Sequence, residues 1–183
     1  MRSLSFTSVL LLLVVFVTGC DESAPTAAQL GSSIENPTEA YSRVVHRAHL
    51  GGADLCEGLG LPTGCDANFS LAAIERGDGS VSGQWQDTFA GGGEGIHVAV
   101  DCLNVIANAA IVGGVITHGT SGGVDVSGQR ALTAVVDNGT SANDPPDQLS
   151  FSFFPTGVDC TALVIGDFAG SLINLGHGQV QVN

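Results

Sequence analysis

Carboxylate and amide side chains gather in one short segment, DNGTSANDPPD, at residues 137–147. Its oxygen-bearing side chains include Asp137, Asn138, Asp144 and Asp147. Calcium binds oxygen ligands supplied by flexible loops, so the segment is a candidate calcium site, although its spacing is not that of an EF-hand. The alternative is a rigid turn around the two prolines, in which Asx side chains accept hydrogen bonds from the nearby backbone.

The five histidines are the other side chains suited to binding metal or transferring protons. His46 and His49 are three residues apart, which places them on opposite faces of a strand, so they do not share a metal there. His118 and His177 each lie beside a glycine at an expected strand end, and His97 is the fifth. The chain has no serine-hydrolase elbow, zinc-protease motif or dinucleotide fingerprint. An enzyme whose Asp and His residues converge at one end of a β-barrel is therefore an alternative rather than the main prediction.

The cysteine count indicates an oxidising compartment. If Cys20 carries a lipid, as argued below, four cysteines remain, and three pairings of them are possible. Cys56 and Cys65 end the Gly/Pro-rich loop CEGLGLPTGC, which favours a bond between them and leaves Cys102 to pair with Cys160. Closing the small ring stabilises by roughly 3 kcal/mol and closing the long ring by roughly 4 kcal/mol. A zinc site is disfavoured because the chain contains no C-x-x-C pair.

The N-terminus carries an export signal. Arg2 is followed by an uninterrupted apolar run at 9–17, which is short for a membrane span and typical of a signal peptide. The run ends in VTGC, which resembles the lipobox of bacterial lipoproteins. The resemblance implies a signal peptide at 1–19, cleavage before Cys20 and lipidation of Cys20. The alternative is an ordinary cleaved signal peptide whose cysteine is incidental.

The segment after Cys20 has the composition of a tether. Residues 20–41 are rich in small polar residues and proline without a hydrophobic period, and a random coil of this length reaches about 25 Å. Without Arg2 the chain has four arginines, no lysine and eighteen acidic residues, a net charge of 4 − 18 = −14. Nucleic acid is therefore not an expected partner, because binding it requires cations that neutralise phosphates. Anchoring to the membrane depends on the lipid.

The rest of the chain, 42–183, reads as a single all-β domain. Apolar and polar residues alternate in GSVSGQWQ and in QLSFSFF, which predicts strands with one solvated face. Gly77-Asp78-Gly79 is a tight-turn signal, and no ten-residue helical stripe is present. We expect an antiparallel sheet of about eight strands, forming a flattened barrel or a sandwich. The expected strands lie near 42–50, 67–76, 80–88, 95–106, 109–118, 129–137, 147–154 and 169–182.

The apolar stretch VDCLNVIANAAIVGGVITHG at 100–119 is either a membrane helix or a hairpin. A membrane helix would bury Asp101 at about 2.5–3.5 kcal/mol, and the glycines and β-branched residues favour strands. We expect a central hairpin, covered on both sides, with its turn at Ala107-Asn108 and a bulge at Cys102-Leu103. Ile96, Val98, Val100 and Cys102 are expected on one face, and Gly113-Gly114 allows close approach of a neighbouring strand.

Three segments together resemble an exported bacterial domain whose members are mostly hypothetical proteins. They are FSLAAIERGDGSVSGQW, VDCLNVIANAAIVGGVITHG and VVDNGTSANDPPDQLSF, and the resemblance covers about 44–182. It implies an antiparallel all-β domain with no established activity. Two positions depart from the usual pattern. Ala107 stands where the pattern has the turn glycine, and alanine resists the positive φ that the turn needs. Thr140 stands where the pattern has a glutamate, which removes a carboxylate from the candidate calcium loop.

These features predict a cell-envelope lipoprotein, lipid-anchored on the extracytoplasmic side of a membrane. Its β domain is expected to be a non-enzymatic binding or structural module whose partner is a protein, a glycan or a small ligand. The alternatives are the Asp/His enzyme and a calcium-binding surface module. No cofactor is predicted.

Overall fold

The computed structural model describes residues 43–183 except 53–54, 63, 66 and 142. The predicted signal peptide, Cys20 and the tether to residue 41 lie outside the described residues. Within them the regular elements are strands and two short 3-10 helices, and no helix there is long and apolar enough to cross a membrane.

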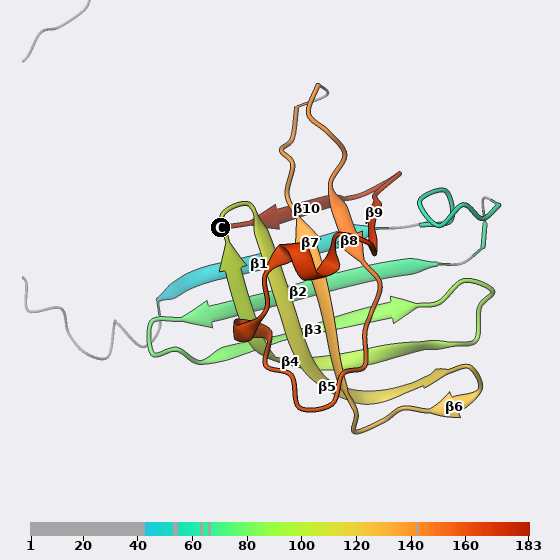
Figure 1. Ribbon diagram of the computed structural model, residues 1–183, viewed down its shortest axis with the longest axis horizontal. Coiled ribbons are helices and arrows are strands. Elements are labelled where there is room, and N and C mark those ends of the chain that lie inside the picture. The colour runs from blue at the N-terminus through green and yellow to red at the C-terminus, as the bar shows by residue number, and fades with distance from the viewer. Residues whose placement is uncertain (1–42, 53–54, 63, 66, 142) are drawn as a thin grey trace, which may run out of the picture. The chain divides into compact units, whose positions relative to one another are not determined.

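The strands form one antiparallel sheet in the order β10-β1-β2-β3-β4-β5-β7-β8-β9, with β6 paired to β5 (Figure 1). This sheet curls into a half-barrel, which confirms the predicted all-β antiparallel class. The strands are β1 (Val44–Gly52), β2 (Asn68–Arg76), β3 (Val81–Thr88), β4 (Gly95–Ile106), β5 (Ala109–Ser121), β6 (Val124–Asp125), β7 (Arg130–Val136), β8 (Gln148–Ser150), β9 (Leu172–Asn174) and β10 (Gln179–Val182). The single strand expected at 169–182 is instead β9 and β10, which lie at opposite edges of the sheet.

The curl gives the sheet two different faces. The inner face holds the main core, in which Trp85, Ile96, Val98 and Val180 are almost completely buried. On the outer face of β4, β5 and β7 lies a second, smaller core that includes Ile111. Strands β5 and β7 are therefore buried on both faces, which explains why their sequences are apolar without alternation.

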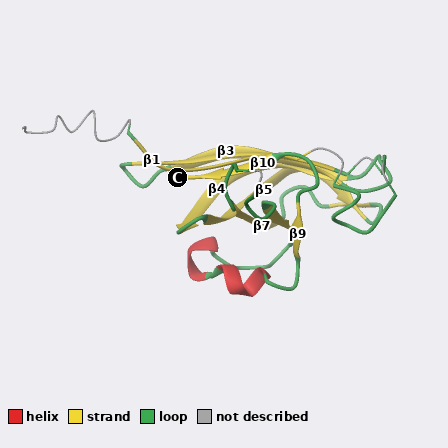
Figure 2. Cartoon of the chain, turned by 90° about the horizontal axis from the view of Figure 1, so that it is seen from above, coloured by secondary structure: helices red, strands yellow, loops and turns green. Residues whose placement is uncertain are grey.

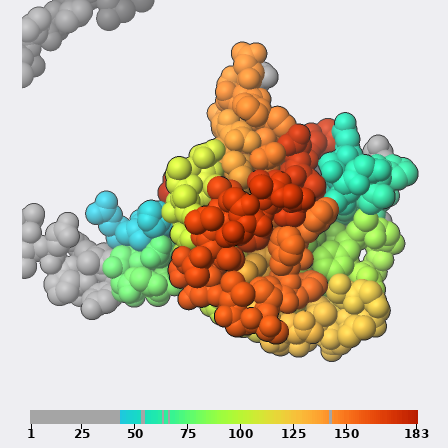
Figure 3. Space-filling view, viewed as in Figure 1, coloured from blue at the N-terminus to red at the C-terminus, as the bar shows by residue number. Residues whose placement is uncertain are grey.

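A segment at 155–171 covers the second core. It contains the 3-10 helices η1 (Cys160–Ala162) and η2 (Ile165–Phe168), which lie against one face of the sheet (Figure 2). In the space-filling view this orange-red segment runs across the visible face (Figure 3). The Cys102–Cys160 disulfide joins the segment to β4, so the predicted pairing is confirmed and the bond fixes the cover to the sheet.

The central hairpin is confirmed as β4 and β5, with its turn at Ala107-Asn108. Ala107 has φ +54°, the left-handed conformation that its side chain resists. Close approach at Gly114 is also confirmed, because a Cβ there would collide with the Ala99 carbonyl. The expectation that Cys102 shares a face with Val100 is wrong. A bulge at Asp101 shifts the register between Val100 and Cys102, which turns Cys102 to the outer face.

The expected strand at 147–154 is also corrected. Strand β8 ends at Ser150, after which only one isolated bridge joins Phe153 to Leu132. Ser150 is buried and Phe151 is 49% exposed, the reverse of the predicted alternation. Burial of Ser150 is tolerated because its hydroxyl accepts the Ala134 N–H and donates to the Phe151 carbonyl. In the segment that follows, the Ser152 hydroxyl reaches Asp87 of β3.

Candidate functional site

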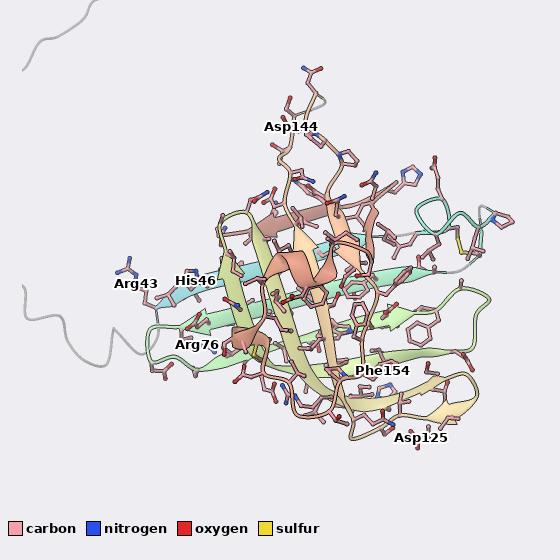
Figure 4. The ribbon with its side chains drawn as sticks, in the orientation of Figure 1. Arg43, His46, Arg76, Asp125, Asp144 and Phe154 are labelled. Atoms are coloured by element: carbon pink, nitrogen blue, oxygen red, sulfur yellow. A yellow bond between two sulfur atoms is a disulfide. The ribbon has the colours of Figure 1, made fainter. Side chains whose placement is uncertain are left out.

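An apolar pocket lies at one end of the inner face. Its volume is ≈ 250 Å³. It is bordered by β2, by β3, by β8 with the residues that follow it, and by β9. Most of its lining is apolar, including Leu55, Phe69, Phe89, Leu149, Phe154 and Ile173. Figure 4 labels Phe154 among the side chains of this part of the molecule. A concave apolar pocket with a few polar groups is the usual form of a small-molecule site.

Asp87 is the ionisable side chain of this pocket. It follows Trp85 on the inward phase of β3 and pairs across the sheet with the buried Phe69 and Ile96. Burial raises its pKa to about 6, and the hydrogen bond from the Ser152 hydroxyl only partly opposes this rise. Ser152 Oγ donates to Asp87 Oδ2 over 2.6 Å. The pocket therefore contains a carboxylate that is poorly solvated and held in place by one hydroxyl.

The small disulfide loop forms one wall of the pocket. The Cys56–Cys65 bond is present, which confirms the second predicted pairing. Leu55 and Leu59 from this loop line the pocket. The Leu55 N–H donates to the Ala67 carbonyl, and the Cys65 carbonyl accepts the Gly91 N–H. These bonds dock the loop against the ends of β2 and β3, so the disulfide fixes the wall facing Asp87.

The size and lining of the pocket suit a small, mainly apolar molecule. One water occupies about 30 Å³ in the liquid, so the pocket has room for about eight waters. A ligand of about that many non-hydrogen atoms would fill it. Asp87 Oδ1 accepts no hydrogen bond from the described residues, so it is available to a ligand. An ammonium or hydroxyl group placed there would donate to the carboxylate, whereas a second carboxylate would be repelled.

The candidate calcium ligands have other partners. Asp147 is buried; its Oδ1 accepts the Asn138 N–H and its Oδ2 accepts the Val180 N–H over 2.6 Å. Asp137 accepts the N–H groups of Gly139 and Val182. Asp144, which the side-chain view places toward the tip of the projecting loop, accepts the Ser141 N–H. In the described part of the chain these carboxylates do not come together as a cluster of metal ligands. The arrangement matches the turn alternative for the loop.

Asp137 and Asp147 cap the edge of the sheet instead. Strand β10 pairs with β1 on one side, and on its other side the N–H groups of Val180 and Val182 meet these two carboxylates. The Asp147 carbonyl also accepts the Leu175 N–H, at the loop joining β9 to β10. The two edge strands of the half-barrel are therefore linked through Asp147 rather than by strand pairing.

The histidines do not join Asp87 in the pocket. His97 and His118 lie on the outer face of β4 and β5, with ring centroids 4.0 Å apart. His46 and His49 lie on β1, and His177 is in the loop before β10. Among the described residues one group of potential metal ligands lies close together, Cys102, Asp159 and Cys160. Its two sulfurs are bonded to each other, so they offer no thiolate.

Asp87 is the residue that sequence reasoning missed. The signal was present in GSVSGQWQDT, where Val81, Gly83 and Trp85 define the inward phase and Asp87 continues it. An acid on the apolar phase of a strand is either paired or functional, because burying an unpaired carboxylate is costly. The opposite wall of the pocket is formed by Ser152 and its neighbours. No pattern in the sequence around Ser152 indicates its contact with Asp87 of β3.

No protein-family model, no curated protein and no solved structure matches the chain. The resemblance to an exported bacterial domain therefore stays a prediction.

Proposed function

We propose that the chain is an extracytoplasmic lipoprotein whose β domain binds a small amphipathic molecule, with an apolar body and an amine or hydroxyl group, in the pocket around Asp87. The observation that carries the proposal is a carboxylate on the inward phase of β3, inside an apolar pocket that a neutral side chain would fill without electrostatic cost. A group that opposes folding yet lines a pocket is characteristic of a binding site.

Binding without catalysis is favoured by the surroundings of Asp87. A reaction that needs both a general acid and a general base requires a second titratable group within reach of the substrate. None of the described histidines lines this pocket, and the Ser152 hydroxyl donates to Asp87, the one ionisable side chain among the lining residues. A single carboxylate with a free oxygen is suited to recognising a donor group, and the apolar walls are suited to excluding water from it.

The ligand class is tested with three matched probes: octylamine, octanol and octanoate. Trp85 is the only tryptophan of the chain and stacks on Phe69 of the pocket wall, with ring centroids 6.3 Å apart. Its fluorescence therefore reports on occupancy of the pocket. At neutral pH we expect the amine to bind most tightly and octanoate most weakly. Equal affinities for all three probes, or no binding of any, would refute the proposed site.

The matched variant is Asp87→Asn, which keeps the shape of the side chain and removes the charge. It should bind octanol almost as the native chain does and lose the preference for the amine over octanoate. Retention of that preference would show that the charge which selects the ligand lies elsewhere.

The anchoring part of the proposal rests on VTGC and on the two disulfides, which belong to an oxidising compartment. In cells expressing Cys20→Ser the chain should leave the membrane fraction, while the native chain stays in it. Equal membrane association of the two would refute lipidation at Cys20 without affecting the pocket.

A further inference from the structure

The outer face carries a pair of histidines from neighbouring strands. His97 on β4 pairs with His118 on β5, and their rings are stacked with centroids 4.0 Å apart and planes 20° apart. Two shallow depressions of the outer surface are lined by both histidines and by Gln86 of β3. The two imidazoles are therefore adjacent and reachable from solvent, on the face opposite the apolar pocket. In the stack their in-plane lone pairs run nearly parallel, so the His97 ring must turn about its side-chain bonds before both rings can point at one ion.

A β-bulge orients the His118 ring. The register of β4 and β5 shifts between His97 and Val98, and Thr117 is the extra residue on β5. The bulge leaves the Thr117 hydroxyl beside His118, with Oγ1 3.4 Å from Nδ1. That hydroxyl donates its proton to the His97 carbonyl over 3.1 Å. It is therefore left to accept a proton from Nδ1 of His118, which places the free lone pair on Nε2.

The surroundings of His97 favour the neutral form of its ring. The pKa of His97 is lowered by loss of solvent around the ring and, secondarily, by the neighbouring His118. Two imidazolium rings in contact repel each other, which disfavours charging both rings at once. A ring whose other nitrogen is held by a hydrogen bond is the usual state of a metal-binding histidine.

We propose that His97 and His118 bind one divalent transition-metal ion, zinc or copper, on the outer face of the β4–β5 hairpin. Imidazole nitrogens suit these ions, whereas calcium and magnesium require oxygen ligands. Within the described residues no third imidazole, thiol or carboxylate completes a cluster with the pair. The remaining positions are open to water or to a ligand from a partner, as the exposed location permits. Thr117 is a positioning residue, because it holds His118 without contacting the ion.

The test uses the mature chain with Cys20→Ser, exported behind the leader of a secreted protein and purified without a polyhistidine tag. The substitution removes the one cysteine outside the two disulfides. Calorimetric titration should show one equivalent of Zn²⁺ or Cu²⁺ bound and none of Ca²⁺. His97→Gln and His118→Gln should each weaken binding by more than about tenfold. His49→Gln is the matched control, since His49 is exposed on β1 opposite Ala72 and Gln181, and it should bind as the unsubstituted chain does.

Two further measurements separate ligation from a general effect on the fold. The electron paramagnetic resonance spectrum of the Cu²⁺ complex should show two imidazole nitrogens, and one in either glutamine variant. Thr117→Val should weaken binding by about tenfold, and Thr117→Ser should restore it. Unchanged binding in His97→Gln and His118→Gln, or no binding by the unsubstituted chain, would overturn the proposal. Circular dichroism of each variant verifies that its fold is retained.

Discussion

Replacing Asp87 by asparagine should stabilise the protein at neutral pH. The pKa of Asp87 is about 6 in the fold against an ordinary value of 3.8, so the folded state favours the neutral carboxyl. A pKa difference of one corresponds to about 1.4 kcal/mol, so ionised Asp87 lowers the free energy of unfolding by up to about 3 kcal/mol above pH 6. Weakening the hydrogen bond from Ser152 offsets about 1 kcal/mol of the gain. The expected net gain is about 2 kcal/mol, or roughly 6 °C in Tm.

The sign of the pH dependence makes this expectation specific. A raised carboxyl pKa means that the folded state binds the proton more tightly, so the native protein gains stability as the pH falls from about 7 to about 4. Asp87→Asn lacks this titration, and its advantage should shrink over the same range and disappear near pH 4. Thermal unfolding of both proteins at matched pH values measures the difference, in which the other titrating groups cancel. An advantage that is independent of pH, or a variant less stable at pH 7.5, would contradict the burial of a charged Asp87.

Other substitutions test the edge of the sheet, the β4–β5 turn and the two disulfides. Asp147→Ala leaves two backbone N–H groups without their acceptor and should cost about 3 kcal/mol or more, measured by urea unfolding, whereas Asp144→Ala at the exposed tip should cost less than about 0.5 kcal/mol; equal costs would refute the edge-capping role. Ala107→Gly removes a side chain held at positive φ and should raise the free energy of unfolding by about 1 kcal/mol, and a lower Tm would contradict that turn. Replacing both cysteines of the Cys102–Cys160 bridge by alanine should lower Tm more than the same change in the Cys56–Cys65 bridge, because the longer ring constrains the unfolded chain more. The Cys56–Cys65 variant should instead lose more affinity for octylamine, and the reverse order of either effect would contradict these roles.

Local patterns were sufficient to predict the fold class and the hairpins. The alternation in GSVSGQWQ, the Gly77–Gly79 turn and the apolar return strand at 111–117 each report a contact between residues close in the sequence, and these contacts are present. The disulfides were also predictable, because few cysteines allow few pairings and one loop favours its own ends.

The errors occurred where the chain makes long-range contacts that leave no local period. A bulge of one residue at Asp101 reverses the direction of every side chain after it, so alternation alone placed Cys102 on the wrong face. After Ser150 the regular strand ends, and Ser152 instead binds Asp87, 65 residues earlier in the chain. Alternation in QLSFSFF is compatible with a strand and with a crossing segment, and the contact that decides between them is absent from the local sequence.

Two inward-facing aspartates show how the same residue type acquires different roles. Asp147 accepts two backbone N–H groups, so its burial satisfies donors at the edge of β10 that no strand pairs, and its charge is offset by those bonds. Asp87 accepts one hydroxyl and faces an apolar pocket, so its burial raises its pKa and opposes folding. Asp147 therefore contributes to the stability of the fold. Asp87 does not, and a ligand that donates a hydrogen bond to its free oxygen would supply the missing stabilisation. The difference between the two carboxylates is therefore the physical reason for placing the binding site at Asp87 rather than in the aspartate-rich loop at 137–147.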